Sequence, residues 1–231
     1  MKFTPTLEAG KLKKRYKRFL ADIEQNNEIN TVFCPNTGSM KSCLGENWPV
    51  LIQLSTNTKR KYPYTLELIH NGECWICINT HRANDIVEEG LKNSHIPELT
   101  QFNKIKREVS FEKKSRFDFL LESNTTKCFL EIKSVTLLEE NTYKFPDAIT
   151  ERGHKHIRHL IEVKKKGYEA VLLFLILRND GTHFEPAAEI DPHYAKLLKQ
   201  ASLAGVKLLA YQTNISDKEI SIGSKTEVKL K

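Results

Sequence analysis

The segment Ser115–Leu137 constrains the fold most, because two strand-like runs flank a short polar turn in it. Arg116–Leu121 and Cys128–Ser134 alternate with the two-residue period of a β-strand, and Glu122–Lys127 supplies the turn. The alternation is expected to place the aromatic residues of the first run on one face of the sheet and its charged residues on the other. The segment therefore predicts a β-hairpin in which charges interrupt one face.

The register of this hairpin decides which side chains meet. A two-residue turn at Asn124–Thr125 would place Asp118 directly opposite Glu131, and Arg116 opposite Lys133. Directly paired residues of neighbouring strands point the same way, with Cβ atoms roughly 4.5–5.5 Å apart. The register therefore predicts that two carboxylates lie side by side.

Two adjacent carboxylates repel each other unless something neutralises them. A divalent cation would do so, and oxygen ligands suit Mg²⁺ or Mn²⁺. Lys133, two residues beyond Glu131 on its strand, would be a cationic neighbour of that ion. The alternative is a pair of exposed strand charges, with Asp118 bridged to Arg116 or Lys133.

The order of Asp118, Glu131 and Lys133 resembles the catalytic signature of the PD-(D/E)XK nuclease superfamily. Nucleases of that type often carry a further acid on the helix before the core sheet. Such a helix is expected after Asn84, which looks like an N-cap, and it would carry Glu88 as a tentative third metal ligand. Glu108, on the strand expected at Lys106–Phe111, is the alternative third acid, and an ordinary solvated charge is the favoured interpretation of either acid.

The whole chain of 231 residues is long enough for one or two domains, and its net charge of +7 allows a polyanionic partner. No window is apolar enough to span a membrane, and the N-terminal residues lack the apolar centre of a secretory signal, so a cytoplasmic location is expected. The five scattered cysteines argue against a disulfide framework. Cys74 and Cys77 have the spacing of a redox or zinc pair, but on a strand they would point to opposite faces.

Residues 1–80 are expected to form the first domain, a small β-barrel of the OB type, because short strand-like runs follow one another with turn signals between them. The expected strands are Lys11–Glu24, Ile29–Cys34, Val50–Ser55, Tyr64–Ile69 and Glu73–Asn79.

The first of these runs is the most basic stretch of the chain. OB folds hold nucleic acid through basic side chains that contact the phosphates and aromatic rings that stack on the bases. The alternative is a solvated edge strand, on which lysines discourage strand-to-strand aggregation. The candidate nucleic-acid-binding residues are Lys11, Lys13, Lys14, Arg15, Tyr16, Lys17 and Arg18.

Residues 81–231 are expected to form the second domain, a mixed sheet with flanking helices, so the fold class is α/β (α+β). Helices are expected at 148–166 and from Asp191 to about Ala204, with a doubly buried strand at Ala170–Leu177. A last strand is expected at Val206–Tyr211, and the tail after Ser216 is expected to fray.

The helix expected at 148–166 carries Arg152 and Lys155 on a polar face. Phosphate contact by this basic face is favoured over a zinc site at its histidines, since no further ligand is spaced to join His156 and His159. The alternative is a plain solvated helix.

Several stretches in one order resemble the sugar fermentation stimulation protein A family over nearly the whole chain. They are KRYKRFLADI, CPNTGSM, SRFDFLLE, EIKSVTL, FPDAITERGHKH and EIDPHYAKLLKQA. The family is described as bacterial and archaeal DNA-binding proteins with an OB-like domain, a restriction-endonuclease-like domain and a link to the regulation of sugar, particularly maltose, utilisation. The resemblance implies that Asp118, Glu131 and Lys133 occupy the nuclease-like motif positions.

Three functions are open at this point. The first is a Mg²⁺- or Mn²⁺-dependent phosphodiesterase acting on DNA, with Asp118 and Glu131 as metal ligands and Lys133 beside the reacting phosphate. The second is a non-catalytic DNA-binding regulator with weak sequence preference, because no recognition helix is evident. The third is a scaffold or small-molecule-binding protein. The sequence predicts no oligomeric state and no cofactor other than the metal.

Overall fold

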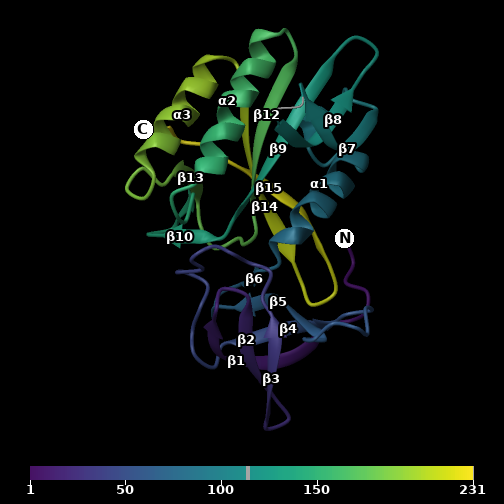
Figure 1. Cartoon of the computed structure of the whole chain (residues 1–231), viewed down its shortest axis with the longest axis vertical. Helices are drawn as coiled ribbons and strands as arrows, with labels where there is room; N and C mark the ends of the chain where they lie inside the picture. Colours follow the sequence, from purple (N-terminus) through teal and green to yellow (C-terminus); the bar gives the residue numbers. More distant parts are fainter. Residues whose placement is uncertain (113–114, 231) are drawn as a thin grey trace.

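The computed structural model describes residues 1–112 and 115–230 of the chain. Figure 1 shows a strand-rich N-terminal part below and a larger sheet flanked by helices above. The fold is mixed α/β, with an OB-like barrel followed by a mixed sheet and helices, which confirms the expected architecture. The described residues contain no helix that is both long and apolar enough to cross a membrane.

The N-terminal barrel is a sheet in the order β3-β2-β1-β4-β5-β6, closed by a parallel pairing of β3 with β5 at Phe33 and Thr65. Its interior is filled by aliphatic side chains such as Ile23, Ile52 and Leu66, none of which is exposed. The strands are β1 (Glu8–Tyr16), β2 (Leu20–Gln25), β3 (Glu28–Phe33), β4 (Pro49–Leu54), β5 (Tyr64–His70) and β6 (Trp75–Cys77).

The prediction of one strand over Lys11–Glu24 is wrong, because the chain reverses in its middle. Tyr16 pairs with Leu20, and the turn between them holds Lys17 and Arg18 at φ 49° and 61°. Neither glycine nor proline marks this turn, and charged residues seldom adopt left-handed backbone, so the sequence carried no turn signal. The basic run therefore forms a hairpin with Lys17 and Arg18 at its tip.

The second half is built on a sheet in the order β15-β14-β12-β9-β8-β7. β9, β12 and β14 run parallel, and the other neighbours are antiparallel. A small sheet, β10-β11-β13, lies at one end. The strands are β7 (Lys104–Phe111), β8 (Ser115–Glu122), β9 (Lys127–Val135), β10 (Leu137–Glu139), β11 (Thr142–Phe145), β12 (Glu169–Ile176), β13 (His183–Pro186), β14 (Lys207–Ile215) and β15 (Ile220–Thr226).

Helices cover both faces of this sheet. α1 packs on one hydrophobic cluster, whereas α2 and α3 pack on another, and the central strand β12 alternates between the two. This is why β12 is buried along almost its whole length, as its apolar run predicted. The helices are α1 (Ala83–Lys92), α2 (Glu151–Lys165) and α3 (Pro192–Leu203), with single 3₁₀ turns at Thr80–Arg82 and Pro97–Leu99.

The observed ends of these helices and strands can be compared with the ends predicted from the sequence. Asp191 caps α3 by accepting a hydrogen bond from the Tyr194 amide, and Pro192 is its first residue, as predicted. α2 begins after the cap Thr150, three residues later than expected. The tail after Ser216 does not fray, because Ile220–Thr226 pairs with β14 as an edge strand.

The barrel and the larger sheet share one hydrophobic cluster, to which the barrel contributes Leu51, Leu68 and Cys77. All five cysteines are free; Cys74 packs against the barrel core instead, so the two cysteines of the pair belong to different clusters. The first residues also reach the larger domain, since Lys2 pairs with Glu219 beside β15.

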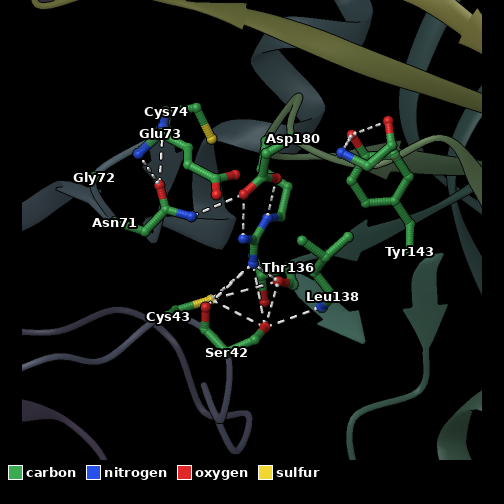
Figure 2. A network of polar contacts seen from close by, with 12 residues as sticks. Ser42, Cys43, Asn71, Gly72, Glu73, Cys74, Thr136, Leu138, Tyr143 and Asp180 are labelled. Atoms are coloured by element: carbon green, nitrogen blue, oxygen red, sulfur yellow. Dashed lines mark hydrogen bonds and ion pairs between the residues drawn. The ribbon is translucent and has the colours of Figure 1, made fainter. Parts of the chain in front are cut away.

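A polar network reinforces this junction (Figure 2). Arg178, 2% exposed, lies between the domains and binds both oxygens of Asp180. It also donates to the Thr136 carbonyl at 2.9 Å and to Ser42 Oγ at 3.2 Å, while Asn71 of the barrel donates to Asp180 at 2.8 Å. The loops of the barrel are thereby held at a fixed place against the sheet.

Candidate functional site

The central hairpin has the predicted register. β8 and β9 pair from Phe119–Leu130 to Glu122–Lys127 around a two-residue turn, where the Ser123 amide donates to the Thr126 carbonyl at 2.9 Å. Backbone pairing stops one residue before Asp118 would meet Glu131. Beyond that point Asp118 Oδ2 accepts the Ile132 amide at 2.7 Å. The carboxylate of Asp118 thus takes the place of a ladder carbonyl where the regular pairing ends.

The prediction that Phe117 and Phe119 share a face is wrong. Phe117 packs in the cluster under α2, and Phe119 packs in the cluster under α1. The cause lies on the neighbouring strand β7, where Glu108 has φ 54° and its pairing with Asp118 is missing. Such a local irregularity re-aims a side chain, much as a β-bulge does. Here it turns Asp118 towards α1.

Asp118 is bound by α1 through Asn84, whose side-chain amide donates to Oδ1 at 3.1 Å. The expected role of Asn84 as an N-cap is wrong, because α1 begins at Ala83 and its cap Arg82 makes no side-chain bond. Burial raises the pKa of Asp118, and the nearby negative charge of Glu131 raises it further against the Ile132 and Asn84 hydrogen bonds. The charge of Glu131 therefore reaches Asp118, but the prediction that the two carboxylates share a face is wrong, because Asp118 is bound from α1 and Glu131 from α2, which cover opposite faces of the sheet.

Glu131 is 3% exposed and is held from the α2 side. Its Oε1 accepts from Lys133 Nζ at 2.6 Å and contacts His156 Nδ1. Burial would raise the pKa of Glu131, but the His156 hydrogen bond and the Lys133 charge outweigh it, so the pKa lies below its ordinary value. Among the described residues, Oε2 of this carboxylate is buried without a hydrogen-bond partner.

His156 links Glu131 to the basic face of α2. Its Nε2 lies 3.4 Å from Arg152 Nε, one helical turn away. A neutral imidazole that donates from Nδ1 and accepts at Nε2 satisfies both neighbours. The sequence argument missed this role of His156, although the four-residue spacing from Arg152 was a usable signal.

A cavity of about 420 Å³ opens where the two domains meet. Asp118, Ile132 and Arg152 line it from the larger domain, and the barrel supplies a wall from its loop at 36–38. Glu131 and Lys133 do not line the cavity. They alternate along β9 with Ile132 and Ser134, which do line it. The other lining residues are Thr80, Ala83, Asn84, Ser134, Thr136, Leu137, Lys144, Phe145 and Asp147.

The barrel wall of the cavity is fixed by contacts that the sequence did not reveal. Arg15 Nη2 donates to the carbonyls of Asn36 and Gly38 at 2.8 and 3.0 Å. The Ser39 amide donates to Asp147 Oδ2 at 2.7 Å. A Cβ on Gly38 would lie 2.2 Å from that same oxygen, so any other residue here would displace the Asp147 carboxylate from its present place.

The predicted nucleic-acid-binding residues separate into bound and exposed ones. Arg15 supports the cavity loop, Lys13 donates to Glu24 and Asn47, and the Tyr16 hydroxyl donates to Asp22. Lys14 is exposed but pairs with Asp22 at 3.4 Å. The residues that are exposed and enter no ion pair among the described residues are Lys11, Lys17, Arg18 and Lys155, while Arg152 lines the cavity.

Neither candidate third acid joins the site. Glu88 pairs with Lys92 at 2.9 Å and with Arg107, and Glu108 pairs with Arg116 at 2.7 Å. The position on α1 that does face Asp118 is occupied by Asn84. In the parts of the chain that the structure describes, no three histidine, cysteine or acidic side chains gather as a metal site.

Asp118 and Glu131 nevertheless fit a hard divalent cation. Buried polar atoms are normally hydrogen-bonded, so the unpartnered Oε2 of Glu131 calls for a ligand. Positive charge at this place would relieve the repulsion that Glu131 exerts on the ionised form of Asp118, and oxygen donors suit Mg²⁺ or Mn²⁺. With two protein carboxylates, water or substrate oxygens would complete the coordination.

Comparison with known proteins agrees with this two-part architecture. Residues 14–78 match the model of the SfsA N-terminal OB domain, and residues 81–219 match the model of the sugar fermentation stimulation protein RE domain. A sugar fermentation stimulation protein homolog from Pelagibacter ubique is 48% identical over 99% of both chains. One from Shewanella frigidimarina is 49% identical over 100% of both.

A solved structure, described as Pyrococcus furiosus SfsA in complex with Ca²⁺, superposes with a TM-score of 0.89. It is 26% identical to this chain, and the match covers 99% of this chain and 98% of that one. Sequence motifs, domain models, relatives and fold thus agree over the full length. The chain belongs to the sugar fermentation stimulation protein family.

Proposed function

We propose that the chain is a divalent-cation-dependent phosphodiesterase that acts on DNA at the cavity beside Asp118. One observation carries the proposal: Glu131 has a buried, unpartnered Oε2, and its charge raises the pKa of a second carboxylate, Asp118. Lys133 and His156 compensate the charge of Glu131 on one oxygen only, and a cation would serve the other oxygen and the ionised form of Asp118. The Ca²⁺ complex of the Pyrococcus relative supports a cation site in this fold. The net charge of +7 favours a polyanionic substrate.

The chemistry follows from the placement of the charged groups. A bound Mg²⁺ or Mn²⁺ would polarise a phosphoryl oxygen and generate a nucleophilic water at neutral pH. Asp118 and Glu131 would hold that cation. Lys133, whose Nζ lies 2.6 Å from Glu131 Oε1 and which does not line the cavity, would act on the developing charge of the phosphate from a distance, by holding Glu131 in place and by adding positive charge near the cation. Arg152 and Lys144, which line the cavity, would orient the phosphodiester.

The test is cleavage of labelled plasmid, linear duplex and single-stranded DNA by the purified protein with Mg²⁺ or Mn²⁺, and with excess chelator. The proposal expects cation-dependent cleavage of at least one substrate. Absence of cleavage from every substrate with both metals would contradict it.

Cation binding can be tested apart from cleavage through Asp118→Asn. Because the pKa of Asp118 is raised in the folded state, its ionised form destabilises the protein once the pH exceeds the pKa of the unfolded chain. In chelator at pH 7 the variant should therefore unfold at a higher temperature than wild type, and the gap should close as the pH falls.

Added Mn²⁺ should reverse this order. At a concentration of 100 times its dissociation constant, the ion should stabilise wild type by about 2.7 kcal/mol and the variant by far less. Thermal unfolding measured with and without Mn²⁺ decides the matter. Equal stabilisation of both proteins would exclude Asp118 as a ligand.

A second candidate function, DNA binding without cleavage, is favoured by the exposed basic hairpin of β1 and β2. Lys17 and Arg18 stand at its tip beside Phe19, which is 46% exposed. Exposed cations beside an exposed ring suit phosphate and base contacts. A protein that only holds DNA would need this hairpin but not Asp118.

The hairpin makes a separate prediction about salt. Replacing Lys17 and Arg18 by glutamine should weaken DNA binding and lower the magnitude of the slope of log affinity against log salt by about 1–2. The reason is that fewer phosphates are neutralised on binding, so fewer counterions are released from the DNA. The matched control is Lys196→Gln with Lys199→Gln, two exposed lysines of α3. Fluorescence anisotropy at several salt concentrations measures both. Equal slopes for the two double variants would exclude the hairpin as a DNA contact.

A further inference from the structure

A second cavity, of about 390 Å³, lies in the barrel beside the first. The two cavities are lined by neighbouring residues of the same two chain segments, 33–38 and 79–84. Thr80 Oγ1 donates to the Pro35 carbonyl at 3.0 Å and joins these segments. Segments 33–38 and 79–84 therefore form a wall between the two cavities. Asp118 lies on one side of this wall, and strands β4 and β5 of the barrel lie on the other.

Part of the wall of the second cavity is a network of polar side chains that bond to one another. Glu67 is 1% exposed, and its carboxylate accepts from Arg82 Nη2 at 2.9 Å and Nε at 3.1 Å. Asn79 donates to the same carboxylate at 2.9 and 3.0 Å. The negative charge of Glu67 is thereby balanced within the wall, which leaves the other charged lining groups to set the character of the site.

The group that stands out is Arg60. Its guanidinium lies over the ring of Phe33, 5.2 Å from the centroid, and its Nη1 donates to Thr65 Oγ1 at 3.0 Å. Among the described residues, the contacts of the Arg60 guanidinium are this hydrogen bond and this ring, and none is with a carboxylate. A guanidinium held over a ring and by one hydrogen bond still offers its positive charge to a phosphate and can stack on a nucleobase.

The shape of the two cavities restricts the form of DNA. Each has the volume of a small-molecule site, within about 300–1,000 Å³, and a wall separates them. The loop at 36–38 also covers one side of the cavity that contains Asp118. A rigid duplex cannot enter two such separate hollows, whereas a flexible single strand can pass from one to the next.

We infer that the two cavities together bind one single strand of DNA, with its reacting phosphate beside Asp118 and a neighbouring nucleotide on Arg60 and Phe33. The inference rests on the proposed function, since it names the substrate form of that site. It makes Arg60 a specificity-determining residue that contacts the strand outside the reacting centre.

The test is the affinity of labelled oligothymidylates, measured by fluorescence anisotropy in chelator so that no cleavage occurs. Arg60→Ala should weaken binding of a strand of about twelve nucleotides by about tenfold, the effect of one lost stacking contact, and leave a dinucleotide within about twofold. Lys59→Ala is the matched control, because Lys59 is an exposed neighbour that lines neither cavity. A duplex of equal length should bind more weakly to wild type and should not respond to Arg60→Ala.

Arg60→Lys separates charge from stacking, since it keeps the cation and loses the planar group. Its affinity for the long strand should lie between those of wild type and Arg60→Ala. Equal losses for Arg60→Ala and Lys59→Ala, or equal losses on single strand and duplex, would overturn the inference. If wild type never cleaves DNA, the proposed function fails while the Arg60-dependent binding can still be observed. If wild type cleaves and Arg60→Ala binds the long strand normally, the inference alone fails.

Discussion

Replacing Glu131 by glutamine is expected to slow cation-dependent cleavage of DNA by about 10²–10³-fold or more, the size of effect expected for a group that acts on the developing charge. Glutamine has the shape of glutamate, and its carbonyl oxygen can still accept from Lys133 and His156. It lacks the negative charge that would hold the cation. DNA affinity in chelator should stay within about twofold, because Glu131 is buried and makes no surface contact.

Single-turnover cleavage with Mg²⁺ or Mn²⁺ measures this loss. The matched control is Glu122→Gln, at the other end of the same hairpin, where the carboxylate pairs with Lys106 and Lys127. That control should cleave at the wild-type rate. If Glu131→Gln retained full activity with an unchanged unfolding temperature, the reacting site would lie elsewhere.

Replacing Arg178 by alanine is expected to destabilise the protein by about 3–5 kcal/mol, because it leaves a buried carboxylate without its cation. The side chains of Arg178 and Asp180 are 2% and 4% exposed, and Figure 2 shows Asp180 close to Asn71 of the barrel. Among the described residues, Asn71 would be the side chain that still donates to Asp180 in Arg178→Ala, and its neutral amide does not balance the carboxylate charge. For a chain of this size the loss corresponds to about 6–20 °C in Tm.

The loss should depend on pH in a defined direction. Burial opposes ionisation of Asp180, but the Arg178 hydrogen bonds and charge outweigh it and lower its pKa. A lowered pKa stabilises the fold above the pKa of the unfolded chain, and this stabilisation disappears as the pH falls through the folded-state pKa. Wild type and Arg178→Ala should therefore differ most near neutral pH and converge in acid.

Urea unfolding at several pH values measures the difference. The matched control is Lys41→Ala, which removes an exposed ion pair with Glu139 between the same two domains and should cost less than about 1 kcal/mol. Equal losses in the two variants would show that the buried pair does not stabilise the junction.

Local signals in the sequence predicted the elements of the site well. The register of the hairpin followed from its turn and its alternation, which involve adjacent residues only. The start of α3 followed from Asp191 and Pro192 for the same reason. The influence of Glu131 on the pKa of Asp118 also followed from this register, whereas the shared face expected for the two carboxylates did not form.

Long-range contacts explain what the sequence could not predict. The turn of Asp118 towards α1 depends on the left-handed backbone of Glu108 in another strand. Asn84 reaches Asp118 only because α1 packs on that face, which also sends Glu88 to Arg107. The barrel wall of the cavity joins residues more than a hundred positions apart, such as Ser39 and Asp147.

The most direct test of the central claim is a crystal structure of the protein soaked in Mn²⁺, with data collected to record anomalous scattering. The account predicts one anomalous peak within about 2.5 Å of a carboxylate oxygen of Asp118 and of Glu131, with Oε2 of Glu131 among its ligands. It would be contradicted by the absence of a peak at saturating Mn²⁺, or by a peak that touches neither carboxylate.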